Sequence, residues 1–404
     1  MVPLEAHRRE VLTRIIPLEP IELGLLEAHG CVLVEDVVAG EDVPRFANSG
    51  MDGYAVASEG LAPGADLAVV GEVAAGAGEL AAVGPGTAVR IMTGAPVPPG
   101  ADAVVPVELT DELGGRVRLR AVPAPGDHVR PVGEDVRAGS TILRAGRRLG
   151  AADVGMLAAV GRATVLVHPR PRVAVISTGN ELVEAGARLR PGQIRDANSF
   201  TLTTMAREAD ATAFRHEIVR DDRRSLTEAF EGAFTHADVL VTSGGVSAGR
   251  YDFVKEILEH LGDVRFRKVA MQPGMPQAFG FIDRGPGHSV PCFGLPGNPV
   301  SAFVSFEVFV RPALRRLQGR TDLNRPRVSV VVDEPLYSPA HKVSFLRVTL
   351  RRDGAVWHAR PTGSQSSNLL RSAVDADGLA EVPAERTEIP AGEAAVVHLL
   401  RTPP

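Results

Sequence analysis

Hydrophobic and polar residues alternate in different ways along the 404-residue chain, and each way predicts a different kind of structure. Residues 4–16 carry apolar side chains at helical spacing before Pro17, which predicts an amphipathic helix. Residues 21–29 predict a second helix, with Gly30 as its C-terminal cap. Residues 43–136 hold short β-type runs between turns rich in glycine and proline, which predicts an all-β insert. The strands expected in the insert are 67–73, 87–92, 103–107 and 116–122, and a helix over 151–160 and a strand over 163–168 follow it.

Strand–helix alternation dominates the chain after Pro169-Arg170-Pro171. The expected strands are 172–176, 211–219 and 238–242, and the expected helices are 198–209, 222–234, 253–261 and 299–318. Such alternation is typical of a mostly parallel, doubly wound sheet with helices on both faces. After a linker at 322–326, runs at 328–332, 343–350 and 355–359 predict a small C-terminal β-domain.

The predicted fold class is therefore mixed α/β and multidomain. Four parts are expected: residues 1–45 with 136–168 as a helical, linking and dimerisation region, 46–135 as the β-rich insert, 169–320 as the α/β domain, and 325–404 as the C-terminal β-domain.

Composition and charge exclude several classes of protein. With 44% hydrophobic and 23% charged residues, the chain can bury sizeable cores. A net charge of -5 argues against a nucleic-acid surface. No apolar run approaches the roughly 20 residues that cross a bilayer, and no secretion signal is evident, so a cytoplasmic protein is expected. Cys31 and Cys292 are predicted to be buried and unpaired, since two distant thiols make neither a disulfide framework nor a zinc site.

Three polar loops follow predicted strands, at residues 177–181, 242–249 and 295–301. In an open α/β sheet, ligands bind beyond the carboxyl ends of the strands, and glycines let the backbone approach a phosphate. A single such loop is more often an ordinary strand–helix turn, but three at one edge favour a binding site. The expected binding residues are Ser177, Thr178, Gly179, Ser243, Gly244, Gly245, Ser247, Pro296, Gly297 and Asn298.

Carboxylates form a second group of candidates, because several lie beside glycine-rich or polar loops. They are Asp52, Asp135, Glu181, Asp196, Asp221 and Asp252. Oxygen ligands of this kind suit Mg²⁺, which shares its coordination sphere with phosphates. For any one of them taken alone, a helix cap or a solvated surface role is the simpler explanation.

The ordered set of motifs resembles the family that includes bacterial MoeA and the gephyrin E domain, and the resemblance covers essentially the whole chain. The matching segments are Asn48–Val56, Arg90–Ala95 with Ala101–Val105, Gly133–Asp135, Ser177–Leu182, Ser243–Ser247, Gly280, Leu295–Ser301 and Gly363–Ser367. Each motif is weak by itself, but their order from end to end is specific.

That resemblance implies an elongated four-part subunit, a homodimer, and a cleft beside the α/β domain that binds molybdopterin. The family reaction inserts molybdate into adenylylated molybdopterin (molybdopterin-AMP) in a Mg²⁺-dependent step that cleaves the adenylate and releases AMP. The residues carried over as catalytic are Asp52, Thr93, Asp135, Glu181, Asp221, Asp252 and Lys268, with Asp135, Glu181 and Asp252 as metal ligands. A molybdopterin adenylyltransferase is a further expected partner.

The chain departs from the family pattern at one place. Gln272 and Met275 stand where much of the family has two lysines associated with the oxyanion. Lys268 is one of only three lysines among 44 basic residues. We therefore expect Lys268, with Arg347 and Ser364, to hold the anion.

Two other functions remain open at this point. A molybdopterin adenylyltransferase resembles the α/β part alone and would leave about 250 residues unexplained. A catalytically weakened binding or scaffold paralogue is compatible with the missing lysines, whereas the retained acids Asp52, Asp135 and Asp252 weigh against it. A dinucleotide enzyme is disfavoured, because no GxGxxG follows the strand at 172–176.

Overall fold

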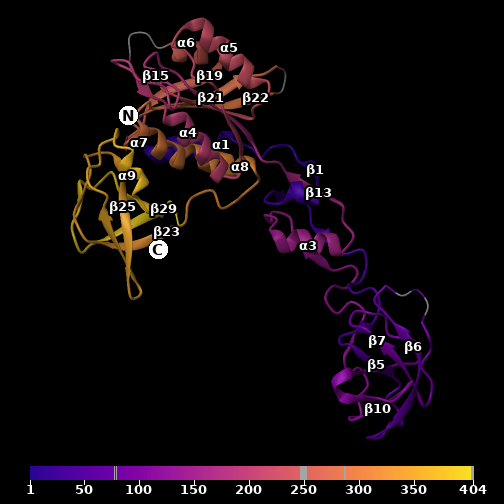
Figure 1. The fold of residues 1–404 in the computed structure, drawn as a ribbon. Helices are drawn as coiled ribbons and strands as arrows, with labels where there is room; N and C mark the ends of the chain where they lie inside the picture. The colour runs from indigo at the N-terminus through magenta and orange to yellow at the C-terminus, as the bar shows by residue number, and fades with distance from the viewer. Residues whose placement is uncertain (77, 79, 246–252, 286–287, 402–404) are drawn as a thin grey trace. The chain divides into compact units, whose positions relative to one another are not determined.

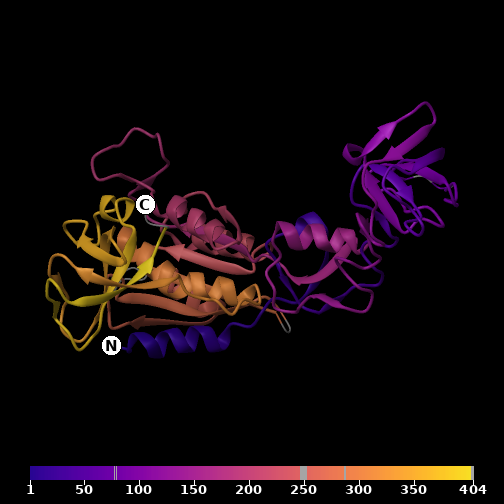
Figure 2. The same ribbon diagram turned by 90° about the horizontal axis from the view of Figure 1, so that it is seen from below.

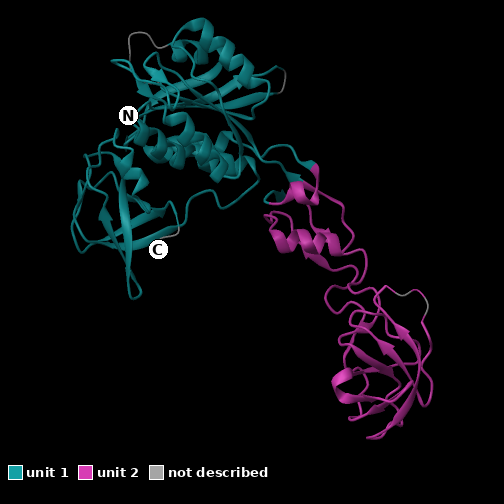
Figure 3. Ribbon diagram, in the orientation of Figure 1, with its two compact units in different colours: residues 1–21, 30–32, 167–404 teal, residues 22–29, 33–166 magenta. Residues whose placement is uncertain are grey.

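The computed structural model describes residues 1–76, 78, 80–245, 253–285 and 288–401. Contacts within the chain divide it into two compact units (Figure 3). Unit 1 comprises residues 1–21, 30–32 and 167–404, and unit 2 comprises residues 22–29 and 33–166. The finer division into four parts stays a prediction. Within the described ranges, no helix combines the length and apolarity that crossing a membrane requires.

A six-stranded sheet forms the centre of unit 1. Its order is β17 (Thr212–Arg215), β14 (Arg172–Ser177), β18 (Val239–Ser243), β22 (Ser289–Leu295), β21 (Pro276–Asp283) and β19 (Gly262–Lys268). The first four strands are parallel to their neighbours, and β21 runs antiparallel to both β22 and β19. The predicted mostly parallel sheet is confirmed, although the sequence reading did not identify β19, β21 and β22.

Helices cover both faces of this sheet because successive side chains of each strand point to opposite sides. Val173 and Val175 of β14 belong to one hydrophobic core, and Ala174 and Ile176 belong to another. Figure 1 shows α5 and α6 on one face and α1, α4, α7 and α8 on the other, and Figure 2 shows α1 running along the sheet. The helices are α1 (Leu4–Arg14), α4 (Asn198–Glu208), α5 (Arg223–Phe234) and α6 (Phe253–Leu261).

The closing helix predicted over 299–318 is present, but it is not uniform. It consists of α7 (Pro299–Ser305), a π-helical turn at Phe306–Val310, and α8 (Arg311–Leu317). Pro299 occupies the first turn, where its missing N–H would be unpaired in any helix.

The C-terminal part of unit 1 is a second six-stranded sheet. Its order is β20 (Met271–Gln272), β25 (Val343–Asp353), β26 (Val356–Pro361), β23 (Arg327–Val332), β29 (Ala394–Leu399) and β27 (Gly378–Val382). Because β27 also pairs with β25, five of these strands form a closed ring. β20 comes from the chain between β19 and β21, so it fastens this sheet to the α/β part.

Unit 2 contains the predicted β insert as a third six-stranded sheet. Its order is β8 (Ala103–Pro106), β5 (Gly53–Val56), β7 (Thr87–Ile91), β6 (Asp66–Val73), β10 (Arg116–Leu119) and β9 (Thr110–Glu112). Tyr54 and Val56 of β5 enter one core, and Ala55 enters another, so the sheet is buried on both sides. The helix expected at 151–160 is α3 (Ala151–Ala159).

The remaining elements are short. They are β1 (Ile21–Gly24), α2 (Leu25–Ala28), β2 (Val32–Leu33), β3 (Val37–Val38), β4 (Asn48–Ser49), a 3-10 turn (Val107–Leu109), β11 (Val129–Arg130), β12 (Thr141–Leu143), β13 (Thr164–His168), β15 (Leu182–Val183), β16 (Ile194–Arg195), β24 (Leu336–Tyr337), α9 (Arg371–Val374) and β28 (Glu388–Ile389).

Two sequence predictions of secondary structure were wrong. The helix expected at 21–29 is instead strand β1 followed by the single turn α2, with the extended residue Gly24 between them. The side chain of Glu22 in β1 lies against Thr164 of β13, so strand contacts override the local apolar spacing. The strand expected at 211–219 is shorter, because β17 ends at Arg215.

Candidate functional site

The three loops predicted to bind ligand leave the sheet at the same edge. Ser177 at the end of β14 is paired in register with Ser243 at the end of β18. Ser243 is paired in turn with Leu295 at the end of β22. Because the three strands are adjacent and parallel, their carboxyl ends meet, as the sequence predicted. We call residues 177–181, 243–245 and 295–298 the carboxyl-edge loops.

Glycine allows two of these loops to approach each other closely. Gly244 has a φ of +96°, and a Cβ there would lie 2.8 Å from the carbonyl oxygen of Thr178. The N–H of Gly244 donates to the carbonyl of Leu295 at 3.1 Å. The Cα of Gly244 would also lie 3.8 Å from a Cβ on Gly297. Any larger residue at position 244 would push the loops apart.

Two hydroxyl groups at this edge can form hydrogen bonds that the described residues do not use. Thr178 is 7% exposed, and its buried Oγ1 has no hydrogen-bond partner among the described residues. Ser243 is buried, and its Oγ accepts a hydrogen bond from Asn198 at 2.7 Å, which leaves its own proton to donate. Buried polar groups are normally paired, so Thr178 Oγ1 is available to a polar partner at this edge.

Two predicted acids of unit 1 lie close enough to interact. Burial raises the pKa of Asp221 above its usual range, and the charges of Glu181 and Asp222 raise it further. The N–H of Asp221 donates to the side chain of Asn180 at 3.2 Å, which holds Asp221 next to the loop after β14. Glu181 is exposed, and its carboxylate folds back on Gly179, within 2.7 Å of where a Cβ would stand. Two carboxylates this close, one of them partly buried with a raised pKa, are suited to a divalent cation.

Lys268 lies at this same edge of the sheet. It is the last residue of β19 and pairs with Pro276, the first residue of β21. Since β19 and β22 are both antiparallel to β21, they run in the same direction, and their carboxyl ends coincide. Lys268 is exposed, three strands from Ser243, which corresponds to about 14 Å at the usual strand spacing.

Arg347, another predicted anion ligand, is completely buried. It is 0% exposed, and burial lowers its pKa to about 10. Its Nε donates to Ser372 Oγ at 3.1 Å and its Nη2 donates to the carbonyl of Ser366 at 3.2 Å. Its Nη1 is buried without a partner among the described residues. Among the described residues, no acidic side chain raises the pKa of Arg347, and burial is the cause of its lowering.

The loop that Arg347 supports contacts the carboxyl edge directly. Asn298 donates from its side chain to Ser367 Oγ at 3.1 Å. The N–H of Val300 donates to the carbonyl of Ser367 at 3.0 Å. Ser364 is exposed on the same loop. The C-terminal sheet therefore brings Ser367, three residues after Ser364, next to the loop that opens α7.

The two residues that depart from the family pattern are neutral and partly buried. Gln272 belongs to β20 and pairs with Ser344 of β25, three residues before Arg347. The carbonyl of Met275 accepts the N–H of Val269 at 2.7 Å. Neither side chain brings positive charge to this part of the edge.

Three predicted residues, Asp52, Thr93 and Asp135, lie in unit 2. Asp52 Oδ1 accepts hydrogen bonds from the N–H of Thr93 at 2.6 Å and from its hydroxyl at 2.7 Å. These bonds lower the pKa of Asp52, the backbone one most. Asp135 is exposed, and its N–H donates to the carbonyl of Val43 at 3.0 Å.

The predicted metal set is divided between the parts of the chain. Asp135 belongs to unit 2 and Glu181 to unit 1, while Asp252, like Ser247, lies outside the described residues. Among the residues that the structure does describe, no three acidic, histidine or cysteine side chains converge.

Sequence reasoning placed Asp196 among several carboxylates and overlooked Asn198. Both contact the carboxyl-edge loops: Ser177 Oγ donates to Asp196 at 3.2 Å, and Asn198 donates to Ser243 and to the carbonyl of Gly297. The run Asp196-Ala197-Asn198-Ser199 at a helix start was read only as a boundary, since such residues commonly cap helices. A hydrogen bond across 99 residues has no signature in local spacing.

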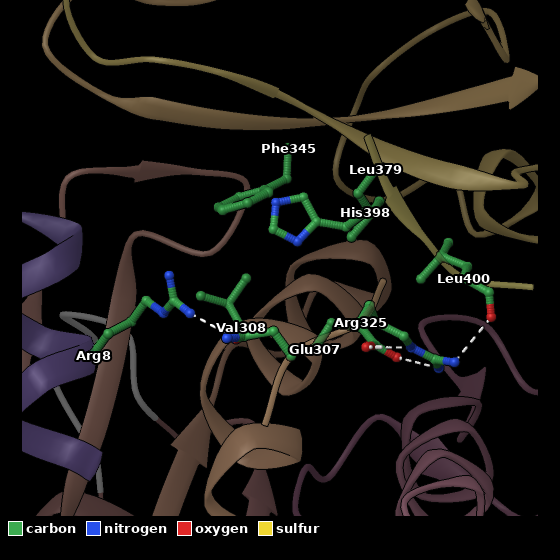
Figure 4. Close-up of a pocket in the computed structure, with 9 residues that line it drawn as sticks. Arg8, Glu307, Val308, Arg325, Phe345, Leu379, His398 and Leu400 are labelled. Carbon is green, nitrogen blue, oxygen red and sulfur yellow. Dashed lines mark hydrogen bonds and ion pairs between the residues drawn. The ribbon is translucent and has the colours of Figure 1, made fainter. Parts of the chain in front are cut away.

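A small pocket elsewhere in unit 1 does not have the character of a substrate site. It lies between the π-helical turn and the C-terminal sheet, and Arg8, Glu307, Arg325 and His398 are among its lining residues (Figure 4). Its volume is about 20 Å³, which suits a single water. Arg325 donates to Glu307 at 2.8 and 3.0 Å, so these buried charges satisfy each other.

Comparison with protein families assigns every large part of the chain. Residues 2–161 match the MoeA N-terminal region (domain I and II), and residues 174–316 match a family described as a probable molybdopterin binding domain. Residues 329–400 match the MoeA C-terminal region (domain IV).

Similar proteins align over nearly the full length. Molybdopterin molybdenumtransferase 2 of Mycobacterium tuberculosis is 43% identical, covering 97% of this chain and 98% of the relative. The Haemophilus influenzae molybdopterin molybdenumtransferase is 35% identical, covering 99% of this chain and 100% of the relative. Two MoeA crystal structures from Pyrococcus horikoshii give TM-scores of 0.81 at 34% identity and 0.74 at 27% identity. They cover 100% and 99% of this chain and all of each neighbour.

Proposed function

Because the chain belongs to the MoeA family and is a molybdopterin molybdenumtransferase of molybdenum cofactor biosynthesis, we propose that its carboxyl edge binds adenylylated molybdopterin and inserts molybdate into it. The observation that carries this proposal is the meeting of three glycine-containing loops at one edge, where polar groups remain unsatisfied. In this reaction a water oxygen attacks one phosphorus of the diphosphate, the P–O bond to the other phosphate breaks, and AMP leaves. Molybdate bonds to the two dithiolene sulfurs, and the oxygen that it loses leaves as water with the thiol protons.

The loops provide donors for the diphosphate. Ser243 has a proton free to donate, and the unpaired hydroxyl of Thr178 lies two strand ends from Leu295. Gly179 and Gly244 allow the close contacts with the Glu181 carboxylate and the Thr178 carbonyl that keep these loops compact beside the proposed phosphate site. The remaining predicted contacts of these loops, from Gly245, Pro296, Gly297 and Asn298, are proposed to hold the pterin and its phosphate.

The acids fit a bound Mg²⁺. Glu181 and Asp221 offer carboxylate oxygens at the edge of the phosphate site. Burial first, and the charges of Glu181 and Asp222 second, raise the pKa of Asp221, and a bound cation would offset both effects. Bound there, Mg²⁺ would neutralise the diphosphate and polarise its phosphorus. Asp221 is proposed to orient the attacking oxygen, and Asp252 completes the proposed acid group from outside the described residues.

Arg347 is the proposed anchor for molybdate. A buried guanidinium without a counter-ion is costly, and a dianion beside its free Nη1 would restore the balance. Lys268 and Ser364 are proposed to assist molybdate binding. Lys268 would supply an exposed positive charge at the carboxyl edge, and Ser364 a hydroxyl donor. Gln272 and Met275 contribute no charge, so molybdate capture rests on fewer cations than in relatives with two lysines there.

The residues of unit 2 supply a second set of groups. Asp52, Thr93 and Asp135 are proposed to face the carboxyl edge of the partner subunit in a homodimer. The chain mass of 42.7 kDa predicts a dimer of about twice that value in light scattering at micromolar concentration. A monomer that still releases AMP would show that the site is built within one chain.

Two further expectations accompany the dimer. A molybdopterin adenylyltransferase is proposed as the partner that delivers the adenylylated substrate, and the cytoplasm is proposed as the compartment. A weakened binding paralogue is the second candidate function, favoured by the neutral side chains of Gln272 and Met275.

A single assay separates these two functions. Purified protein is mixed with adenylylated molybdopterin, Mg²⁺ and molybdate, and both AMP and active cofactor are measured. The proposed enzyme releases AMP in step with cofactor formation. Substrate binding without AMP release at any molybdate concentration would instead identify the binding paralogue.

A further inference from the structure

Asp196 is a buried carboxylate whose oxygens are all taken by protein donors. Its Oδ1 accepts from Ser177 Oγ at 3.2 Å and from the N–H of Ser199 at 3.0 Å. Its Oδ2 accepts from Ser199 Oγ at 2.5 Å and lies 3.8 Å from Arg215. These donors occupy both oxygens of Asp196, so we assign it a structural role. It joins the start of α4 to the end of β14.

Asn198, two residues later, joins the other two strand ends. Its Nδ2 carries two hydrogens, and these reach Ser243 Oγ at 2.7 Å and the carbonyl oxygen of Gly297 at 2.7 Å. A carbonyl can only accept, so the amide nitrogen and not the amide oxygen faces Gly297. The side chain of Asn198 therefore links the loop after β18 to the loop after β22.

The backbone of the same segment holds the remaining loop. The N–H of Ile194 donates to the carbonyl of Glu181 at 2.8 Å, and the N–H of Asp196 donates to the carbonyl of Val183 at 3.0 Å. The parallel pairing of β15 with β16 forms this connection. Residues 194–198 thus contact all three carboxyl-edge loops.

The loops after β18 and β22 share one backbone hydrogen bond, from the N–H of Gly244 to the carbonyl of Leu295 at 3.1 Å. Beyond it, Gly244 and Gly297 meet without side chains, so no side-chain packing between them fixes the separation of the loops. Catalysis of phosphoryl cleavage depends on placement, and an error of about 1 Å can cost on the order of a hundredfold in rate. A polar cross-link with fixed hydrogen-bond lengths supplies the placement that the glycines do not.

We propose that Asn198, supported by Asp196, is a positioning residue that sets the spacing of the three carboxyl-edge loops for the diphosphate of adenylylated molybdopterin. This role rests on the proposed function of the edge, and it assigns Asn198 no contact with the reacting atoms. Loss of its two donors lets the loops after β18 and β22 separate, so substrate binding weakens more than the chemical step slows.

Three full-length variants test this role. Asn198→Ala removes both donors, and Asn198→Asp keeps the shape but cannot donate to the carbonyl of Gly297. Thr201→Ala is the matched control, because Thr201 is on the same helix and its hydroxyl bonds only to the carbonyl of Ala197. Both Asn198 variants should raise KM for adenylylated molybdopterin about tenfold while kcat of AMP release falls less than threefold. Thr201→Ala should match the wild type.

Amide hydrogen exchange provides a readout that does not depend on turnover. Exchange at residues 243–245 and 297–298 should become faster in both Asn198 variants and should not change in Thr201→Ala. Wild-type KM and wild-type exchange in the Asn198 variants would overturn the positioning role. If the wild type releases no AMP, the proposed function fails, and the exchange result alone still decides whether Asn198 spaces the loops.

Discussion

Charged side chains at the carboxyl edge of unit 1 and Asp52 in unit 2 have opposite kinds of surroundings. At the edge, Asp221 is held beside another carboxylate, and Arg347 is buried without a counter-ion. In unit 2, Asp52 is exposed, and both its neighbouring donors come from Thr93. Among the described residues of unit 1, the charges of Asp221 and Arg347 lack an opposite charge beside them. The charge on Asp52 in unit 2 is satisfied by the two donors of Thr93.

This difference indicates which charged groups a bound ligand would stabilise most. Folding gains nothing from an unsatisfied buried charge, so such groups persist where a bound partner satisfies them. A charge that the protein already satisfies is suited to orienting a group without adding much binding energy. Removing an edge charge should therefore harm function without harming stability, and the effects should be smaller in unit 2.

The largest effect is expected from Asp221→Asn. It should lower single-turnover AMP release about a hundredfold, because a metal-holding and orienting charge is lost at the phosphates. The pKa of Asp221 is raised in the folded protein, so its ionised form is unfavourable above that pKa, and the amide should keep or raise the melting temperature at pH 7. A lower melting temperature with normal AMP release would show that Asp221 stabilises the fold and does not serve the reaction.

Arg347→Met should come next. It removes a buried cation whose pKa is lowered to about 10, and it loses two hydrogen bonds from a charged group, which contribute about 1.5–3 kcal/mol each. We expect cofactor formation to need at least about tenfold more molybdate. Molybdate should raise the melting temperature of the wild type and leave that of the variant unchanged. An equal rise in both proteins would remove Arg347 from the anion site.

In unit 2, Asp52→Asn and Asp135→Asn should each reduce AMP release about tenfold, with an unchanged melting temperature. Thr93→Val sharpens this prediction. The Thr93 hydroxyl helps to lower the pKa of Asp52, so its loss raises that pKa, and activity should begin to fall at a higher pH on the acidic side. The pH profile of AMP release measures this, with the wild type as reference. An acidic limb that does not move would exclude ionised Asp52 from the reaction.

The smallest effect is expected from a change at Lys268, at the carboxyl edge. Lys268 is exposed, so water and salt screen its charge. Lys268→Ala should raise the molybdate concentration for half-maximal cofactor formation about threefold, and Gln272→Lys with Met275→Lys should lower it. Titration of cofactor yield against molybdate compares the three proteins. No change in either variant would mean that charge at these positions does not hold the anion.

Local pattern was enough to predict three of the four parallel strands, β14, β17 and β18, because buried runs such as Val173–Ile176 and the polar, glycine-containing loops that follow are local features. It was not enough for Ile21–Gly24, where strand contacts override apolar spacing. Strands β21 and β22 were also missed, since their antiparallel pairing depends on contacts between segments and not on a helix-forming interval.

The candidate site was predictable only where chemistry follows a strand end. Ser177, Ser243 and Gly297 could be named from their loops, and the register brings them to one edge. The burial of Arg347 could not be inferred, because an arginine in a β-type run is equally compatible with solvent. Asn198 was overlooked because its partners are 45 and 99 residues away.

The chain order of unit 1 has a consequence for synthesis on the ribosome. Leu4, Val11 and Ile15 of α1 belong to the same core as Leu314 and Leu317 of α8, about 300 residues later. At 5–20 residues per second, the partners of α1 emerge roughly 15–60 s after it. During that interval unit 2 can be completed, while the apolar face of α1 has no core to join. Helix α1 is therefore among the last helices of unit 1 to dock.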